Sequence, residues 1–210
     1  MIPAKEKVLV CPHCGGEKSI IQITSGNTIG GHQWWDMKAD FPMLPIPSPI
    51  QKCSQCKKYY HIESASSYEG DNYSFDKGEL SYEEAKEAWS QLKDTLSGGM
   101  LTSLALVYIH AYNDKYQRVL NKENTKIDYI EPKEADLEEF RSVVYTLIDN
   151  FQVESPLIYA EFLREARLFD EAMKIANSTD IPKEGVYANL YTYIVDNCRK
   201  KNSLVYIVEF

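Results

Sequence analysis

Two Cys-x-x-Cys pairs in the first quarter of the chain limit its fold more than any other feature. The first pair is Cys11 and Cys14, followed directly by two glycines, and the second pair is Cys53 and Cys56. Two thiolates at this spacing can bind one tetrahedral metal ion from a tight turn, and the glycines permit the positive φ that lets backbone amides point at sulfur. Four sulfurs complete the coordination shell of Zn²⁺, so the spacing predicts one shared structural site.

The long interval between the two pairs is compatible with a shared site. It holds 38 residues, from Gly15 to Lys52. Closing a loop of this length costs roughly 3 kcal/mol of chain entropy. Structural zinc typically contributes about 10–16 kcal/mol of apparent binding free energy. The metal contribution therefore outweighs the loop entropy.

The same cysteines could instead form disulfides, redox pairs or an iron site. Residues 1–10 are short and charged and do not form a secretory signal, so we expect a reducing, cytoplasmic compartment in which disulfides are rare. A thioredoxin-like redox pair needs a βαβ context, which the pattern lacks. Iron binds the same four ligands and stays open as an alternative to zinc.

Short β-rich segments flank the cysteine pairs. Residues 7–10 lead into the first pair, 19–24 predict the return strand, and 57–63 alternate apolar and polar residues after the second pair. These segments predict a small antiparallel zinc ribbon over residues 1–64. Four prolines between positions 42 and 49 exclude a helix there and predict an extended insertion.

This insertion also carries several large apolar side chains. A small zinc module has little interior, so these side chains need a surface to cover them. They either pack against the ribbon or the helical half, or form an exposed docking site for another protein. The candidate docking residues are Trp34, Trp35, Phe41, Met43 and Leu44.

The second half of the chain has a helical apolar period. Residues 65–80 are small and polar and predict a linker. Ser81 and Glu84 have the spacing of a capping box, and six helices are expected over residues 81–210. We expect the Gly98-Gly99 pair to end the first helix and Asp170 to cap the fifth. The predicted fold class is α+β, a small antiparallel four-cysteine module followed by an all-α domain of helical hairpins.

Residues 157–176 resemble a tetratricopeptide-type helical hairpin. The likeness is carried by Tyr159, Ala160, Leu163, Arg167, Phe169, Asp170, Glu171 and Ala172. Arg167 stands where such turns usually have glycine, and no second copy follows at a 34-residue period. Together with the cysteines, the chain resembles an uncharacterised bacterial zinc-ribbon protein with a tetratricopeptide-like helical C-terminal region. The resemblance implies a scaffold or adaptor, since such hairpins bind protein segments.

Charge favours a protein partner over nucleic acid. The formal net charge is −8; residues 1–64 carry seven lysines and five acidic residues, whereas the remainder carries 16 basic and 26 acidic residues. The acidic C-terminal half repels phosphate backbones. The alternative is a nucleic-acid-associated accessory protein that uses Lys52, Lys57, Lys58 and Tyr59 beside the second cysteine pair. No apolar run is long enough to span a membrane, so no membrane association is expected.

No catalytic motif stands out in the sequence. The nucleophile elbow, the P-loop, the dinucleotide glycine motif and His-Glu-x-x-His are all missing. His32 near Asp36 and His61 near Glu63 could form acid–base pairs, but such positions are more often solvated. A zinc ion held by four cysteines has no open position for catalysis. We therefore expect a non-enzymatic, zinc-stabilised protein-interaction or adaptor protein in the cytoplasm, whose partner the sequence does not identify.

Overall fold

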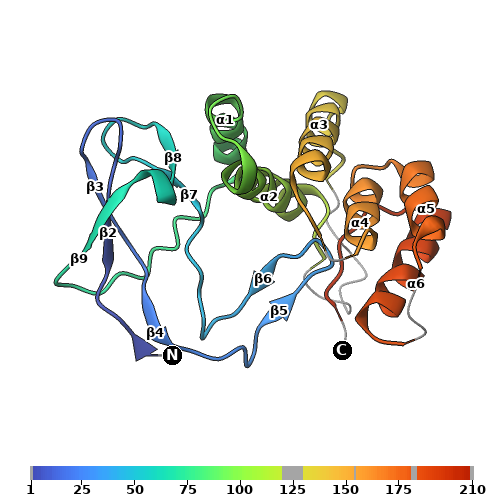
Figure 1. Ribbon diagram of the computed structural model, residues 1–210, viewed down its shortest axis with the longest axis horizontal. Helices are drawn as coiled ribbons and strands as arrows, with labels where there is room; N and C mark the ends of the chain where they lie inside the picture. Colours follow the sequence, from blue (N-terminus) through green and yellow to red (C-terminus); the bar gives the residue numbers. More distant parts are fainter. Residues whose placement is uncertain (1, 120–129, 154, 181–183, 209–210) are drawn as a thin grey trace. The chain divides into compact units, whose positions relative to one another are not determined.

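The computed structural model describes residues 2–119, 130–153, 155–180 and 184–208 (Figure 1). Within these residues the fold is α+β, with short antiparallel strands in the first third of the chain and six α-helices after them. The coarse fold class expected from the sequence is therefore confirmed. No helix in this described part of the chain combines the length and the apolarity needed to cross a membrane.

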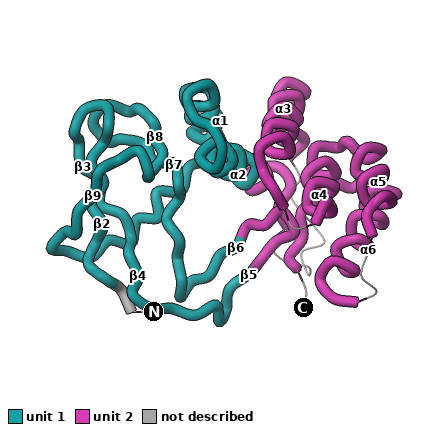
Figure 2. Tube along the Cα trace, viewed as in Figure 1, with its two compact units in different colours: residues 1–32, 39–111 teal, residues 33–38, 112–210 magenta. Residues whose placement is uncertain are grey.

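Internal contacts divide the chain into two compact units (Figure 2). Unit 1 comprises residues 1–32 and 39–111, and unit 2 comprises residues 33–38 and 112–210. This division differs from the boundary at 65–80 that the sequence suggested. The division falls inside a helix, and the short segment 33–38, which lies between the cysteine pairs in sequence, belongs to unit 2.

Each cysteine pair lies in the turn of a β-hairpin in unit 1. Strand β2 (Lys7–Val10) pairs antiparallel with β3 (Glu17–Ile20), and β9 (Ser66–Glu69) pairs with the other side of β2. Strand β7 (Ile50–Lys52) pairs antiparallel with β8 (Tyr59–His61). The other strands are β1 (Ile2–Pro3), β4 (Ile23–Ser25), β5 (His32–Gln33) and β6 (Ala39–Asp40).

The segment expected to be a linker is instead anchored in unit 1. Its first part is β9, and Gly70 N–H extends the pairing by donating to the Glu6 carbonyl at 2.9 Å. Further on, Ser48 N–H donates to the Lys77 carbonyl at 2.7 Å. Gly78 has φ +65°, and a Cβ there would lie 2.1 Å from Gln51 Oε1. The small polar residues of this segment therefore pack closely within unit 1 and do not form a free linker.

The helices follow the apolar periodicity of the sequence. They are α1 (Tyr82–Leu92), α2 (Gly98–Tyr116), α3 (Glu134–Asn150), α4 (Leu157–Glu165), α5 (Phe169–Ser178) and α6 (Val186–Arg199), and a short 3₁₀ turn, η1 (Ile62–Ser64), follows β8. The capping box of α1 is present, because Ser81 Oγ accepts from Glu84 N–H at 3.3 Å and Glu84 Oε2 accepts from Ser81 N–H at 3.3 Å.

Two expected helix boundaries are wrong. The first helix ends at Leu92, and Gly98 with Gly99 begins α2 instead of ending α1. Asp170 does not cap α5, because Leu168 occupies the N-cap and makes no side-chain cap hydrogen bond. Asp170 lies in the first turn of α5, where its carboxylate faces the positive end of the helix dipole.

Each unit has its own aromatic and aliphatic core. In unit 1, Leu9 and Ile20 pack with the buried cysteines Cys11 and Cys53 and with Tyr60. In unit 2, the rings of Tyr112 and Phe140 stack with centroids 3.9 Å apart. Two residues after α6 also pair within unit 2, since isolated β-bridges join Ile207 to Trp34 and Val205 to Arg118.

Candidate metal centre

The two cysteine turns have the same backbone design. In the first, Cys11 N–H donates to the Gly16 carbonyl at 2.8 Å and Gly15 N–H donates to the Cys11 carbonyl at 2.9 Å. In the second, Cys53 N–H donates to the Lys58 carbonyl at 2.9 Å and Lys57 N–H donates to the Cys53 carbonyl at 3.0 Å. The residue after the second cysteine has positive φ in both turns, +73° at Gly15 and +62° at Lys57.

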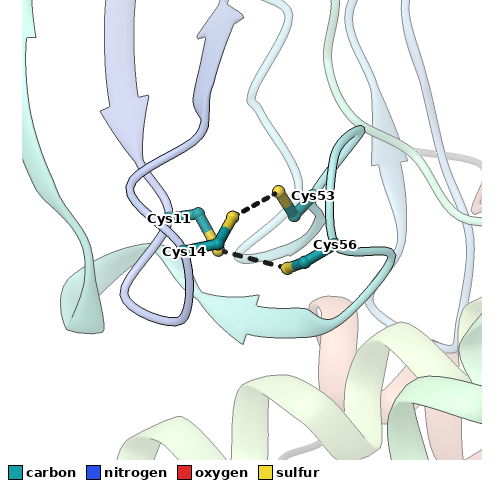
Figure 3. A group of neighbouring side chains, drawn as sticks. All are labelled: Cys11, Cys14, Cys53 and Cys56. Atoms are coloured by element: carbon teal, nitrogen blue, oxygen red, sulfur yellow. Dashed lines mark hydrogen bonds between the residues drawn. The ribbon is translucent and has the colours of Figure 1, made fainter.

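The four sulfur atoms converge into one cluster (Figure 3). The sulfurs of Cys14 and Cys53 lie 3.6 Å apart and those of Cys11 and Cys56 lie 3.8 Å apart. All four lie within 4.8 Å of one another. Metal–sulfur bonds of about 2.3 Å place sulfurs about 3.8 Å apart in a regular tetrahedron. The four cysteines predicted as ligands are therefore positioned to bind one metal ion.

Backbone amides prepare the cluster for a cation. Gly16 N–H points at Cys14 Sγ at 3.4 Å. Burial opposes ionisation of Cys53, but the N–H groups of Cys56 and Gln55 lower the pKa of its thiol to about 6. Gly16 N–H also lowers the pKa of Cys14, yet hydrogen bonds with Cys56 and the other cysteines raise it to about 11. Because metal ligands must be thiolates, a bound cation offsets this mutual repulsion.

Contacts around the cluster tie the two hairpins together. His13 Nε2 donates to the Tyr59 carbonyl in β8 at 3.1 Å, so the histidine inside the first turn braces the second hairpin. Gly16 lies against Gln55, because a Cβ at position 16 would be 2.8 Å from the Gln55 side chain. Tyr59 Oη donates to Glu87 in α1 at 2.8 Å and attaches that helix to the same hairpin.

The structure separates the candidate docking residues into two groups. Trp34 is 5% exposed, and its Nε1–H donates to the Val119 carbonyl at 3.4 Å within unit 2, so it is withdrawn from the docking set. Trp35 is half-buried and stacks on Tyr193 with ring centroids 5.3 Å apart. The other three belong to unit 1, where Met43 is exposed and Phe41 and Leu44 are half-buried.

The cationic patch suggested by the sequence is largely neutralised. Lys52 Nζ lies 3.1 Å from Glu84 Oε1 and 3.7 Å from Glu87 Oε2. Tyr59 is 1% exposed, so its ring has no face for stacking on a base. Lys57 and Lys58 remain exposed beside the metal centre.

A buried polar cluster in unit 2 was not identified from the sequence. Glu161 pairs with Arg164 through two hydrogen bonds of 2.6 and 2.8 Å, and both side chains are at most 1% exposed. Asn113 Nδ2 donates to Asp36 Oδ2 at 3.0 Å and to Glu165 Oε2 at 2.9 Å. The available signal was three charged residues inside α4, a helix whose neighbouring residues are apolar.

A second buried ion pair belongs to the same cluster. Both terminal nitrogens of Arg118 donate to the Asp36 carboxylate, and the guanidinium lies 4.7 Å from the centroid of the Trp34 ring. The sequence suggested only a pairing of Asp36 with His32. Asp36 is buried against Arg118, which follows the C-terminal end of α2, and it therefore has a structural role in unit 2.

No family model matches the chain, and neither the curated proteins nor the solved structures contain a match to it.

Proposed function

We propose that this chain is a non-enzymatic, zinc-stabilised protein-interaction or adaptor protein of the cytoplasm. The four-sulfur cluster supports a structural metal, because four thiolates fill a tetrahedral shell and leave no position for substrate or water. Zn²⁺ held by Cys11, Cys14, Cys53 and Cys56 would fix the two hairpins of unit 1 as a zinc ribbon. Iron in the same shell is distinguished by elemental analysis and by its visible absorption.

The helical part of the proposal rests on the α4–α5 hairpin. Ala160 and Ala172 are fully buried, as expected for small residues that let two helices approach closely. Arg167 has φ +61° in the turn between them, the conformation for which a glycine is usual in such turns. We infer a tetratricopeptide-type hairpin from these features.

An apolar groove in unit 1 carries the interaction proposal. The groove has a volume of about 610 Å³, and one wall is the extended segment from Leu44 to Pro47. Ile20 of β3 and Ile23 of β4 line it, together with Ile21 from the connection between these strands. Ile46 on the wall is 69% exposed. Exposed apolar side chains beside an apolar groove are typical of sites that bind another protein.

The proposed occupant is an extended apolar segment of a partner protein. Strand β9 also lines the groove, and it is an edge strand that, within the described part of the chain, pairs with β2 alone. All four of its side chains are exposed. An edge strand offers backbone N–H and C=O groups to an added strand, and the groove can accept alternate side chains of that strand.

The test compares two surface variants of the full, metal-loaded chain in affinity capture from native cells. Ile46→Asp places a charge in the groove wall, whereas Ile130→Asp places one at an exposed position of unit 2. We expect one protein to be retained by wild type and by Ile130→Asp, lost with Ile46→Asp, and to bind directly once purified, with at least about tenfold weaker affinity for Ile46→Asp. Equal binding by all three proteins would contradict the proposal.

A nucleic-acid-associated role is the second candidate and has less support. It now depends on Lys57 and Lys58, since acidic side chains of α1 pair with Lys52. Two free lysines provide weak phosphate binding. RNA or DNA affinity that falls steeply with salt and disappears on substitution of both lysines would favour this role instead.

A further inference from the structure

A cavity in unit 2 has the composition of a small-molecule site. Its volume is about 670 Å³, within the range of about 300–1,000 Å³ that is usual for such sites. The lining combines aromatic rings, from Trp35, Tyr193 and Tyr206, with amide side chains and a single cation, Lys200. All of these residues belong to unit 2, and none of them is used by the metal centre or the groove of unit 1.

The aromatic wall of this cavity is held in place from behind. Trp35 stacks on Tyr193 with an interplanar angle of 27°. Tyr193 is itself fixed, because its Oη donates to the Leu204 carbonyl at 3.0 Å and the buried Arg164 guanidinium lies 5.0 Å from its ring centroid. A rigid indole beside an open cavity is a suitable platform for a planar ring.

The polar lining is arranged to donate hydrogen bonds. Asn202 Nδ2 donates to Asn197 Oδ1 at 2.7 Å and to Tyr206 Oη at 3.4 Å. Because Tyr206 Oη accepts this hydrogen bond, its own O–H can donate to another group. Among the described residues, neither the Lys200 ammonium nor the Asn189 amide has a hydrogen-bond or ion-pair partner. An acceptor with negative charge is the group that satisfies this set.

The local charge points to the same chemistry. Of the residues that the structure describes, Lys200 is the only charged one that lines the cavity, and Arg199 and Lys201 beside it are exposed. This basic cluster contrasts with a chain whose formal net charge is −8. Asp196 lies 4.0 Å from Arg199 and offsets part of this charge, and the C-terminal end of α6 carries partial negative charge, so the attraction for an anion rests on the Lys200 ammonium that lines the cavity.

The spacing along α6 sets the distance between ring and anion. Tyr193, Asn197 and Lys200 follow one another at intervals of four and three residues, which places them on one face of the helix. Seven residues of helix rise by about 10 Å. The flexible Lys200 side chain can shorten this span, so one compact ligand can reach both the aromatic wall and the ammonium group.

We propose that this cavity binds a small ligand in which a planar ring carries an anionic group, with the ring on Trp35 and the anion at Lys200. A nucleoside monophosphate and an aromatic carboxylate share this chemistry. The inference is independent of the partner-binding groove, so the two can fail separately.

The experiment titrates the full, metal-loaded chain with adenosine 5′-monophosphate and with benzoate, followed by calorimetry and by the NMR signal of the Trp35 indole N–H. Binding of either probe with a shift of that signal supports the proposal, and their relative affinities separate the two sources. Adenosine and inorganic phosphate are tested alone. Each is expected to bind at least about fivefold more weakly than the nucleotide, because each lacks one of the two contacts.

Neighbouring lysines provide the matched control. Lys200→Gln and Lys201→Gln remove the same charge one residue apart, but only Lys200 lines this cavity. We expect Lys200→Gln to raise the Kd about tenfold and Lys201→Gln to change it less than about twofold. Trp35→Leu should raise the Kd about tenfold and abolish the indole signal. If that variant fails to fold, the comparison of Lys200→Gln with Lys201→Gln still tests the proposal.

Three results would overturn the proposal. The first is that neither probe binds at millimolar concentration. The second is that inorganic phosphate binds as tightly as the nucleotide, which would mean that the ring contributes nothing. The third is that Lys200→Gln and Lys201→Gln weaken binding equally, which would show general electrostatic attraction without a site.

Discussion

Lys57 occupies, in the second cysteine turn, the backbone position that Gly15 occupies in the first. Both residues have positive φ and both donate a backbone hydrogen bond to the first cysteine of their pair. A side chain in this conformation is strained relative to glycine by roughly 1–2 kcal/mol. The two cysteine turns therefore share a backbone conformation with positive φ at this position, whichever residue supplies it.

Lys57→Gly should relieve this strain. We expect the free energy of unfolding of the metal-loaded chain to rise by about 0.5–1 kcal/mol, because the glycine's greater freedom in the unfolded chain offsets part of the gain. Urea unfolding measures the change. Lys58→Gly is the control, since Lys58 is equally exposed but has no positive φ, and it should give no stabilisation. A destabilising Lys57→Gly would contradict this account.

Glu165 is the least satisfied acid of the buried cluster in unit 2. Its Oε1 has no hydrogen-bond partner among the described residues, and the side chain is fully buried. Burial, followed by the negative charges of Glu161 and Asp36, raises the pKa of Glu165 well above its usual range, although Arg164 and Asn113 oppose this. A neutral Glu165 also leaves two carboxylates for the two buried guanidiniums.

Glu165→Gln should therefore change how stability depends on pH. The folded-state pKa lies above the unfolded value of about 4.3, so folding retains a proton and wild type loses stability as pH rises between these two pKa values. We expect the variant to gain relative to wild type by at most about 1.4 kcal/mol per pH unit in that interval. Thermal unfolding from pH 5 to 9 measures the difference.

The control for this comparison is Glu184→Gln, which changes an exposed carboxylate of unit 2. Its difference from wild type should not grow with pH above 5. If Glu165→Gln behaves in the same flat way, Glu165 is ionised in the folded protein and the assignment of its proton is wrong.

At the level of single elements, α1 is stabilised by a reciprocal cap. Ser81→Ala removes the hydroxyl that accepts from Glu84 N–H, and it should lower the free energy of unfolding by about 1 kcal/mol. Ser90→Ala is the matched control, because Ser90 is exposed in the last turn of the same helix, where alanine has the higher helix propensity. Urea unfolding should show a loss for the first variant and none for the second.

The elements themselves were largely predictable from local pattern. In α3, for example, Leu137, Phe140, Val144 and Leu147 follow one another at helical spacing in the sequence, and all four are buried. Local pattern failed where tertiary contacts decide the outcome. Gly98 begins a helix instead of ending one, and the small polar residues after position 65 add a strand to the β2 sheet, because backbone pairing there outweighs composition.

For the whole molecule, the metal ligands were predictable and the unit boundary was not. Cysteine spacing is a short-range signal, so Cys11, Cys14, Cys53 and Cys56 could be assigned without knowing the fold. The assignment of residues 33–38 to unit 2 depends on Asp36 meeting Arg118, a contact 82 positions apart in sequence. No local pattern marks such a pair.

Cys53→Ser should remove the bound metal and disorder the two hairpins. The expected loss is a large part of the roughly 10–16 kcal/mol that a structural metal supplies, while most of the helical circular dichroism at 222 nm remains. Metal content and the spectrum are measured together. Cys198→Ala, which alters a buried cysteine of unit 2 outside the cluster, should retain the metal. Simultaneous collapse of all helical signal in Cys53→Ser would show that the units fold as one.

The short segment 33–38 means that no single scission of the chain yields both units intact. A fragment that starts at residue 81 keeps Arg118 and its partner Asp114 but loses Asp36, which accepts from both terminal nitrogens of the guanidinium. Removing one partner of a buried ion pair destabilises a protein by about 3–5 kcal/mol. We expect this fragment to remain unfolded when expressed alone and to be rescued by a synthetic peptide spanning residues 30–40, with recovery of ellipticity as the readout. Rescue should fail with a peptide in which asparagine replaces Asp36.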